Sequence, residues 1–126
     1  MIVTLLQVAL GGAIGAMGRY LTGVAVFKLL GAMAFPLGVI TVNVVGSAIM
    51  GMFAELAAAR GLTHLGPFVM TGMLGGFTTF SAFSLETVSL IERGDMGLAA
   101  LYVGLSVVLS IGALFVAMTW MRGVLA

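Results

Sequence analysis

The chain has 126 residues, of which 62% are hydrophobic and only 7% charged, with a formal net charge of +1. Soluble domains carry about 25% charged residues, and a chain this short has too little interior to bury so much apolar surface. The composition therefore predicts an integral membrane protein that contacts lipid and has no nucleic-acid partner. The absence of cysteine excludes disulfides and thiolate metal sites.

Charged residues separate four long apolar segments. The uncharged runs 29–54, 61–85 and 96–121 each exceed the roughly 20 residues that cross ~30 Å of hydrocarbon. The first segment spans the membrane only if Arg19 lies within it. We therefore predict an all-α fold in which residues 1–126 form a single transmembrane domain. The expected helices are about 3–28, 37–58, 66–92 and 97–122.

Basic residues are balanced between the two sides of such a protein. Four spans place both termini and the second loop on one side, with Arg60 and Arg122, whereas Lys28 and Arg93 lie on the other. The positive-inside rule needs an excess of Lys and Arg on one side. Two possibilities stay open: insertion in both orientations, which permits an antiparallel homodimer, or a weak bias from Arg19 or the N-terminal amine.

Small residues recur at helical spacing in the first two segments. Close backbone approach is what helix packing in lipid requires, so we interpret these residues as helix interfaces. They are Gly11, Gly12, Gly15 and Gly18 in the first segment, and Asn43, Ser47 and Gly51 in the second.

The third segment contains an unfavourable helix centre, Gly75-Gly76 followed by Thr78-Thr79. Irregular backbone at membrane depth is tolerated only where protein or a water-filled path satisfies its polar groups. A broken helix offers carbonyls to a cation and N–H groups to an anion. The segment therefore predicts a break in mid-membrane, with a mere kink in a packing helix as the alternative.

Two polar side chains lie inside predicted spans. Arg19 either anchors the first helix at the interface or gives positive potential to an anion-collecting mouth. Asn43 either forms a hydrogen bond between helices or donates to an ion. Both alternatives stay open for each residue.

Hydroxyls and aromatic rings add to this set of donors. Tyr102, Ser106 and Ser110 recur at i, i+4 and i+8, so their hydroxyls share one face of the fourth helix. Phe80 and Phe83 share a face of the third, and aromatic ring edges carry partial positive charge. A path rich in donors and without a central carboxylate favours an anion over a cation.

Catalysis finds no support in the sequence. His64 has no Asp or Cys partner, and Glu86, Glu92 and Asp95 fall near a helix end, where a solvated position or a cap is expected. Glu86 is closest to the predicted break, and its role stays open. We therefore expect a protein that is not an enzyme.

Three motifs resemble those of the Fluc, or CrcB, fluoride channels. Residues 11–20, GGAIGAMGRY, resemble the family's opening GG-x-x-G-x-x-x-R-aromatic pattern, and residues 42–46, VNVVG, resemble its V-N-x-x-G. Residues 75–84, GGFTTFSAFS, resemble the signature GG-x-TTFSTFS. The order and spacing agree over the whole chain, and the third motif is highly specific.

The resemblance implies an antiparallel, dual-topology homodimer in the bacterial inner membrane. Two pores along the subunit interface would export fluoride passively and relieve its toxicity. It also implies a buried Na⁺ on the two-fold axis, bound by the main-chain carbonyls of Gly75 and Thr78, and a vestibule arginine at Arg19. The implied pore residues are Asn43, Phe80, Phe83, Ser84, Tyr102, Ser106 and Ser110.

Two positions depart from the family pattern. Val39 replaces a common threonine near one pore mouth, and Ala82 replaces the threonine of the signature. A small multidrug transporter is similar in size, but it needs a carboxylate in the first helix, where this chain has only Arg19. An assembly subunit without transport explains the glycines but neither the broken helix nor the line of hydroxyls.

Overall fold

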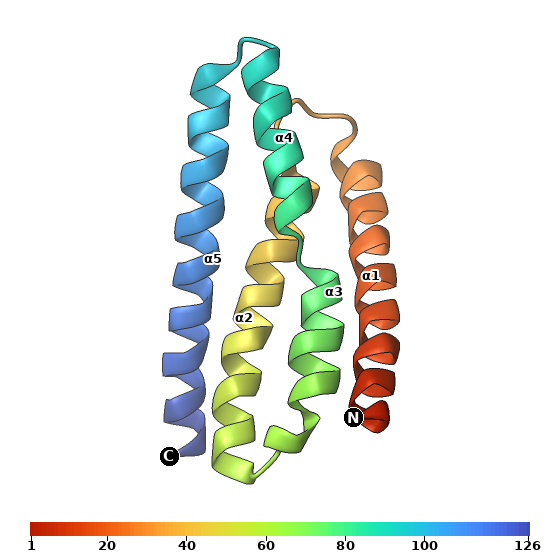
Figure 1. Cartoon of the computed structure of the whole chain (residues 1–126). Helices are drawn as coiled ribbons and strands as arrows, with labels where there is room; N and C mark the ends of the chain where they lie inside the picture. Colours follow the sequence, from red (N-terminus) through yellow and green to blue (C-terminus); the bar gives the residue numbers. More distant parts are fainter.

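A computed structural model describes all residues, 1–126, as an all-helical protein (Figure 1). Four segments are long and apolar enough to cross a membrane, which confirms the predicted number of spans. The third segment, Thr63–Glu92, consists of several helical pieces. The elements are α1 (Ile2–Leu30), α2 (Leu37–Arg60), the 3₁₀ turn η1 (Thr63–Leu65), the π-helix η2 (Pro67–Leu74), α3 (Gly75–Phe77), α4 (Phe80–Glu92) and α5 (Met96–Leu125).

α1, α2 and α5 end two or three residues beyond the expected limits, whereas α4 ends at Glu92 as expected. α1 and α2 stop at Gly31 and Gly61, whose φ angles of 74° and 67° suit glycine and break the helical path. Lys28 and Arg60 lie in the last turns of these helices, from where long basic side chains can extend to the membrane surface. Both termini lie at one end of the molecule, as predicted (Figure 1).

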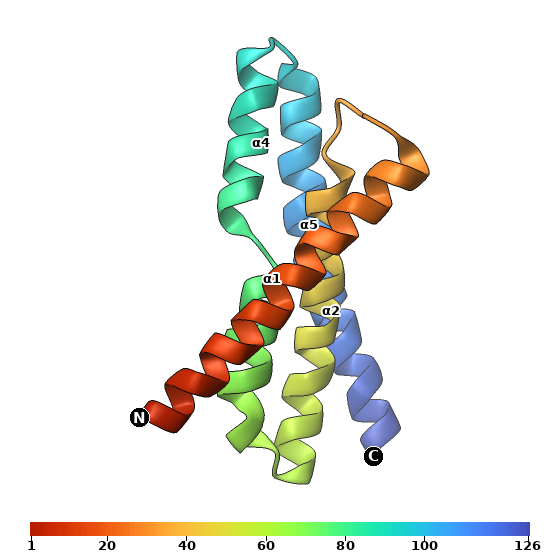
Figure 2. The ribbon, with the colours of Figure 1, turned by 90° about the vertical axis from the view of Figure 1, so that its right-hand side faces the viewer.

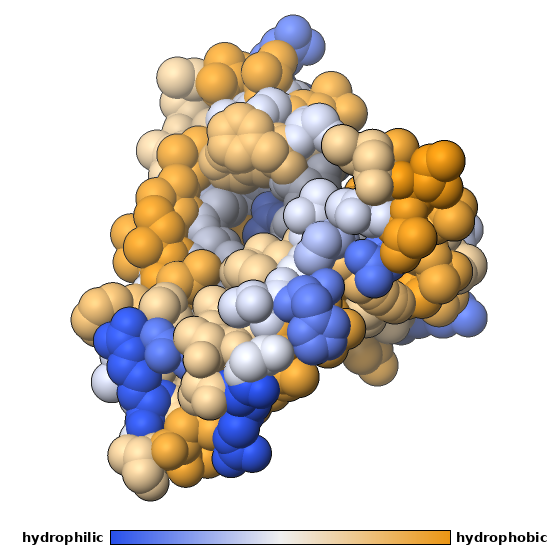
Figure 3. Space-filling view, turned by 60° about the horizontal axis from the view of Figure 1, so that its bottom comes forward, coloured by the Kyte–Doolittle hydropathy of each residue, from blue (hydrophilic) through white to orange (hydrophobic).

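Most of the surface is apolar. Only 14 of the 126 residues are buried, so the large hydrophobic side chains of α1 and α5 mostly face outward. Figure 3 shows hydrophobic residues over much of the molecule, with hydrophilic ones gathered at the end that comes forward. Such a surface is stable only against lipid or another protein chain.

α1 crosses obliquely over the third span (Figure 2). The contact depends on glycine: a Cβ added to Gly11 or Gly15 would overlap the main-chain oxygen of Phe68 or Met73 in η2. The predicted packing role of these two glycines is confirmed. Gly12 differs from them, because a Cβ there meets nothing within 4 Å.

α2 and α5 run in the same direction and pack along most of their lengths (Figure 1). A Cβ added to Gly51 would lie 2.6 Å from the Leu114 carbonyl oxygen, so this glycine permits close approach. Near the helix ends, Arg122 Nε lies 2.8 Å from Glu55 Oε1. The pair of helices forms one wall of the site described below.

Gly15→Ala is expected to destabilise the fold by about 1–3 kcal/mol, because the added methyl group overpacks the contact with Met73. Thermal unfolding in detergent, followed by tryptophan fluorescence and gel filtration, measures this loss. Gly12→Ala is the matched control and should unfold like the parent. Equal melting temperatures for both variants would contradict the tight α1–η2 contact.

Candidate functional site

The third span is broken at two extended residues. Thr78 has φ −85° and ψ 158°, and Thr79 has φ −150° and ψ 118°, so the backbone leaves the helix between α3 and α4. The predicted break is confirmed, but Gly75 and Gly76 themselves remain helical. Gly76 instead permits close packing, since a Cβ there would lie 2.7 Å from the carbonyl oxygen of Gly12.

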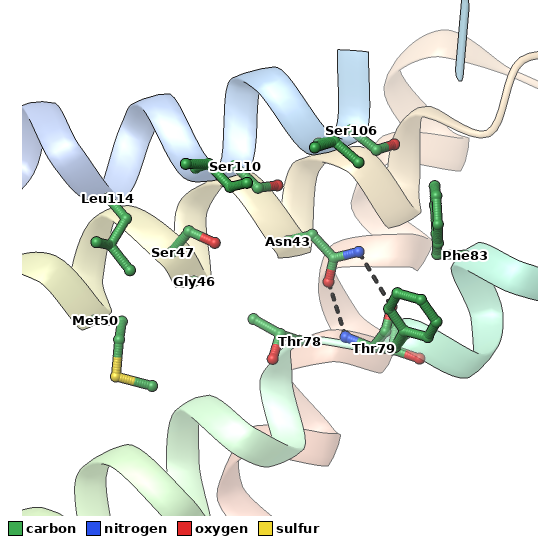
Figure 4. Close-up of a pocket in the computed structure, with 13 residues that line it drawn as sticks. Asn43, Gly46, Ser47, Met50, Thr78, Thr79, Phe83, Ser106, Ser110 and Leu114 are labelled. Atoms are coloured by element: carbon green, nitrogen blue, oxygen red, sulfur yellow. Dashed lines mark hydrogen bonds between the residues drawn. The ribbon is translucent and has the colours of Figure 1, made fainter. Parts of the chain in front are cut away.

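Asn43 of α2 holds the break with two hydrogen bonds (Figure 4). The Thr79 N–H donates to Asn43 Oδ1 at 2.8 Å, and Asn43 Nδ2 donates to the Thr79 carbonyl at 3.1 Å. Of the two alternatives for Asn43, the hydrogen bond between spans is therefore present. The amide has two N–H donors, so one is left for a ligand.

The same geometry leaves two carbonyls without their helical donors. In a continuous helix the Gly75 carbonyl would accept from the Thr79 N–H, which Asn43 takes. The Thr78 carbonyl would accept from the Ala82 N–H, which donates to Thr79 Oγ1 at 3.1 Å. Main-chain carbonyls are suitable ligands for a monovalent cation, and the Gly75 and Thr78 oxygens are of this kind.

A groove of about 420 Å³ lies between α2, the break and α5. Six predicted site residues line it, and no Asp, Glu, Lys, Arg or His does. Figure 3 shows a hollow in the surface whose walls are more hydrophilic than the apolar residues around it. The predicted residues that line the groove are Asn43, Thr78, Phe80, Phe83, Ser106 and Ser110.

The hydroxyls of α5 face inward, as the spacing predicted. Tyr102 is fully buried and Ser106 is 6% exposed, and neither hydroxyl has a hydrogen-bond partner within the chain. A buried hydroxyl without a partner costs about 1–3 kcal/mol. Such groups indicate a place where water or a ligand completes the hydrogen bonding.

Aromatic rings border this line of hydroxyls. The ring centroids of Phe80 and Phe83 are 5.4 Å apart, and those of Phe83 and Tyr102 are 5.3 Å apart. Phe80 is nevertheless 77% exposed, on the open side of the groove. Most of its ring therefore lacks a packing partner within the chain.

Comparison with known proteins identifies the family. The family model described as "CrcB-like protein, Camphor Resistance (CrcB)" matches residues 6–118. The chain belongs to the CrcB family. It is 66% identical over 125 residues to a protein of Ruegeria sp. (99% of each chain), 59% over 126 to one of Cereibacter sphaeroides (100% of each) and 51% over 123 to one of Paracoccus denitrificans (98% of each). All three relatives are named "Fluoride-specific ion channel FluC".

This membership confirms the resemblance drawn from the three motifs. It also places the chain among ion channels and not among enzymes, as the sequence predicted. The family assignment leaves the small multidrug transporter without support.

Five predicted site residues do not line the groove: Gly75 and Tyr102, described above, Glu86, and the pair Arg19 and Ser84. Arg19 Nε donates to the Gly76 carbonyl at 3.1 Å, which places its charge at the C-terminal end of α3. Ser84 Oγ donates to the carbonyl of Phe80 at 3.0 Å. Their vestibule and pore roles stay predictions.

Glu86 borders a separate cavity of about 210 Å³ beside the 31–36 loop. Its carboxylate makes no hydrogen bond or ion pair within the chain. Nothing in the structure explains its presence there.

Sequence reasoning missed two polar residues that line the groove, Ser47 and Thr79. The signal for Ser47 was present, because it follows Asn43 by one helical turn, but the spacing was interpreted as packing. The signal for Thr79 was its place in the break.

Proposed function

We propose that the protein is a fluoride-selective channel of the bacterial inner membrane, through which fluoride leaves the cell passively. The observation that carries this proposal is the groove of hydrogen-bond donors without any acidic or basic side chain, in a chain whose full-length relatives are named fluoride-specific channels. Export down the gradient would relieve fluoride toxicity.

The chemistry of the groove suits a small, strongly hydrated anion. Fluoride gives up water only where donors replace it. The free N–H of Asn43 and the hydroxyls of Ser106 and Ser110 supply such donors, and the ring edges of Phe80 and Phe83 add weaker positive charge. Tyr102 continues this line at the buried end, where its hydroxyl has no hydrogen-bond partner within the chain.

A second copy of the chain would complete the pore. One chain leaves the groove open on the side where Phe80 is exposed, so a single subunit gives the ion only part of a wall. The balance of Lys and Arg between the two ends supports insertion in both orientations. We infer an antiparallel homodimer with pores at its interface.

Na⁺ would bind where the two breaks meet. The carbonyls of Gly75 and Thr78 from both copies would give four oxygens around the two-fold axis. When bound there, Na⁺ would offset part of the cost of bringing an anion into the membrane. The loss of both helical donors, described above, is what supports this assignment.

Phe80→Ile and Asn43→Asp are each expected to abolish fluoride efflux. The first removes a ring edge, and the second puts a negative charge beside the path and replaces the Nδ2 donor. The measurement uses purified protein in fluoride-loaded liposomes, with a fluoride electrode and valinomycin to carry the compensating charge. Gel filtration shows whether each variant keeps its dimeric size.

Phe115→Ile is the matched control, because Phe115 is 67% exposed and lies outside the groove. It should conduct like the parent protein. Chloride-loaded liposomes should release little chloride. A folded dimer without fluoride efflux would overturn the proposal and favour an assembly subunit, whereas parental efflux in a mutant would remove that residue from the path.

Dual topology predicts labelling of half the molecules from one side. The chain has no cysteine, so Ala126→Cys at the exposed C-terminus creates a single reporter. An impermeant maleimide should modify about half of the protein in sealed cells and all of it after permeabilisation. Labelling of all or none in sealed cells would contradict insertion in both orientations.

Removal of Na⁺ is expected to reduce fluoride efflux strongly, because the four carbonyls would then lie together without a cation to balance them. The same liposome assay measures this effect, with N-methylglucamine replacing Na⁺ on both sides from purification onward. Efflux at the parental rate in thoroughly Na⁺-free samples would exclude the cation from the mechanism.

A further inference from the structure

We propose that Ser47 is a further ion-binding residue that donates its hydroxyl to fluoride beside Ser110. The proposal rests on the proposed function and adds a residue from α2 to the path. Ser47 lines the groove together with Ser106 and Ser110. It would provide a second donor at a level where α5 alone provides one.

Hydrogen bonding separates the groove serines from several other helical hydroxyls, although Thr4, Thr71 and Ser89, outside the groove, also make no side-chain hydrogen bond. Helical Ser and Thr residues commonly donate to the carbonyl four residues earlier. Several hydroxyls here do so, and all but one of them lie outside the groove: Thr22, Thr41, Thr78, Ser84, Thr87 and Thr119, of which Thr78 is the exception. The hydroxyls of Ser47, Ser106 and Ser110 make no hydrogen bond within the chain, so they remain available to a ligand.

A buried serine in the same groove lacks a hydrogen-bond partner. Ser106 is 6% exposed and its Oγ has no acceptor or donor within the chain, although it lines the same groove. Small residues alone would mark only helix packing. The unpartnered Ser106 hydroxyl indicates that something polar occupies the groove beside Ser47.

The register of α2 and α5 places the donors in two levels. Both helices run in the same direction, so one helical turn along each leads from Asn43 and Ser106 to Ser47 and Ser110 (Figure 4). One turn further, the Gly51 backbone approaches Leu114, so the two helices keep the same register. Ser47 and Ser110 therefore lie at the same level, on the two adjacent helices that form one wall of the groove.

At the level of Ser47 the lining of the groove also changes from polar to apolar. Beyond it the lining becomes apolar, with Met50 and Leu114 (Figure 4). Once an anion has passed Asn43, Ser47 is the one remaining side-chain donor that α2 contributes to the groove. Two hydroxyls on adjacent helices would bind the ion better than one, because each replaces a lost water molecule.

Ser47→Ala is expected to slow fluoride efflux roughly tenfold, as loss of one hydrogen bond to a charged group implies. Ser47→Thr, which keeps a hydroxyl, should conduct faster than Ser47→Ala. Ser89→Ala is the matched control. Ser89 lies on α4 outside both cavities, so fluoride efflux through this variant should equal that of the parent. Gel filtration verifies that each variant is folded.

Ser47→Val and Ser47→Thr form a second pair, identical in shape except for the hydroxyl, and they replace the alanine variant if it fails to fold. Efflux from Ser47→Ala equal to or above that of the parent or Ser47→Thr would overturn the proposal, because only the volume of the groove would then matter. Failure of the parent protein to conduct would instead overturn the proposed function, so the two failures are distinguishable.

Discussion

The pair of hydrogen bonds between Asn43 and the backbone of Thr79 is the interaction on which the site depends. A chain break at membrane depth is costly unless other groups pair with the exposed backbone. Asn43 supplies a donor and an acceptor to the same residue, at 3.1 and 2.8 Å. By taking the Thr79 N–H it also frees the Gly75 carbonyl, so one side chain both stabilises the break and exposes a potential cation ligand.

Close packing of small residues brings the remaining parts of the site into place. Gly11 and Gly15 let α1 lie directly on η2, and Gly76 lets α1 approach α3. Gly46 makes room for the Thr78 side chain beside α2, and Gly51 keeps α2 and α5 in register. Because lipid does not drive apolar helices together, such contacts replace the hydrophobic core of a soluble protein.

The hydroxyl groups of the helices differ in whether they find a partner within the chain. A hydroxyl that donates to its own helix is satisfied within the chain, as at Ser84. Ser47, Ser106 and Ser110 are not satisfied in this way, and all three line the groove. The proposed anion path rests on these donors, in a groove that no acidic or basic side chain lines.

The sequence by itself determined the number of spans, the inward face of Tyr102, Ser106 and Ser110, and membership of the CrcB family. These features follow from apolar length, helical periodicity and short motifs, which are local properties of the chain. The tertiary structure decided that the break lies at Thr78 and Thr79, that Arg19 caps α3 and that Ser47 lines the groove. Those outcomes depend on which partner a backbone or hydroxyl group finds on another helix, and spacing along one helix does not specify that partner.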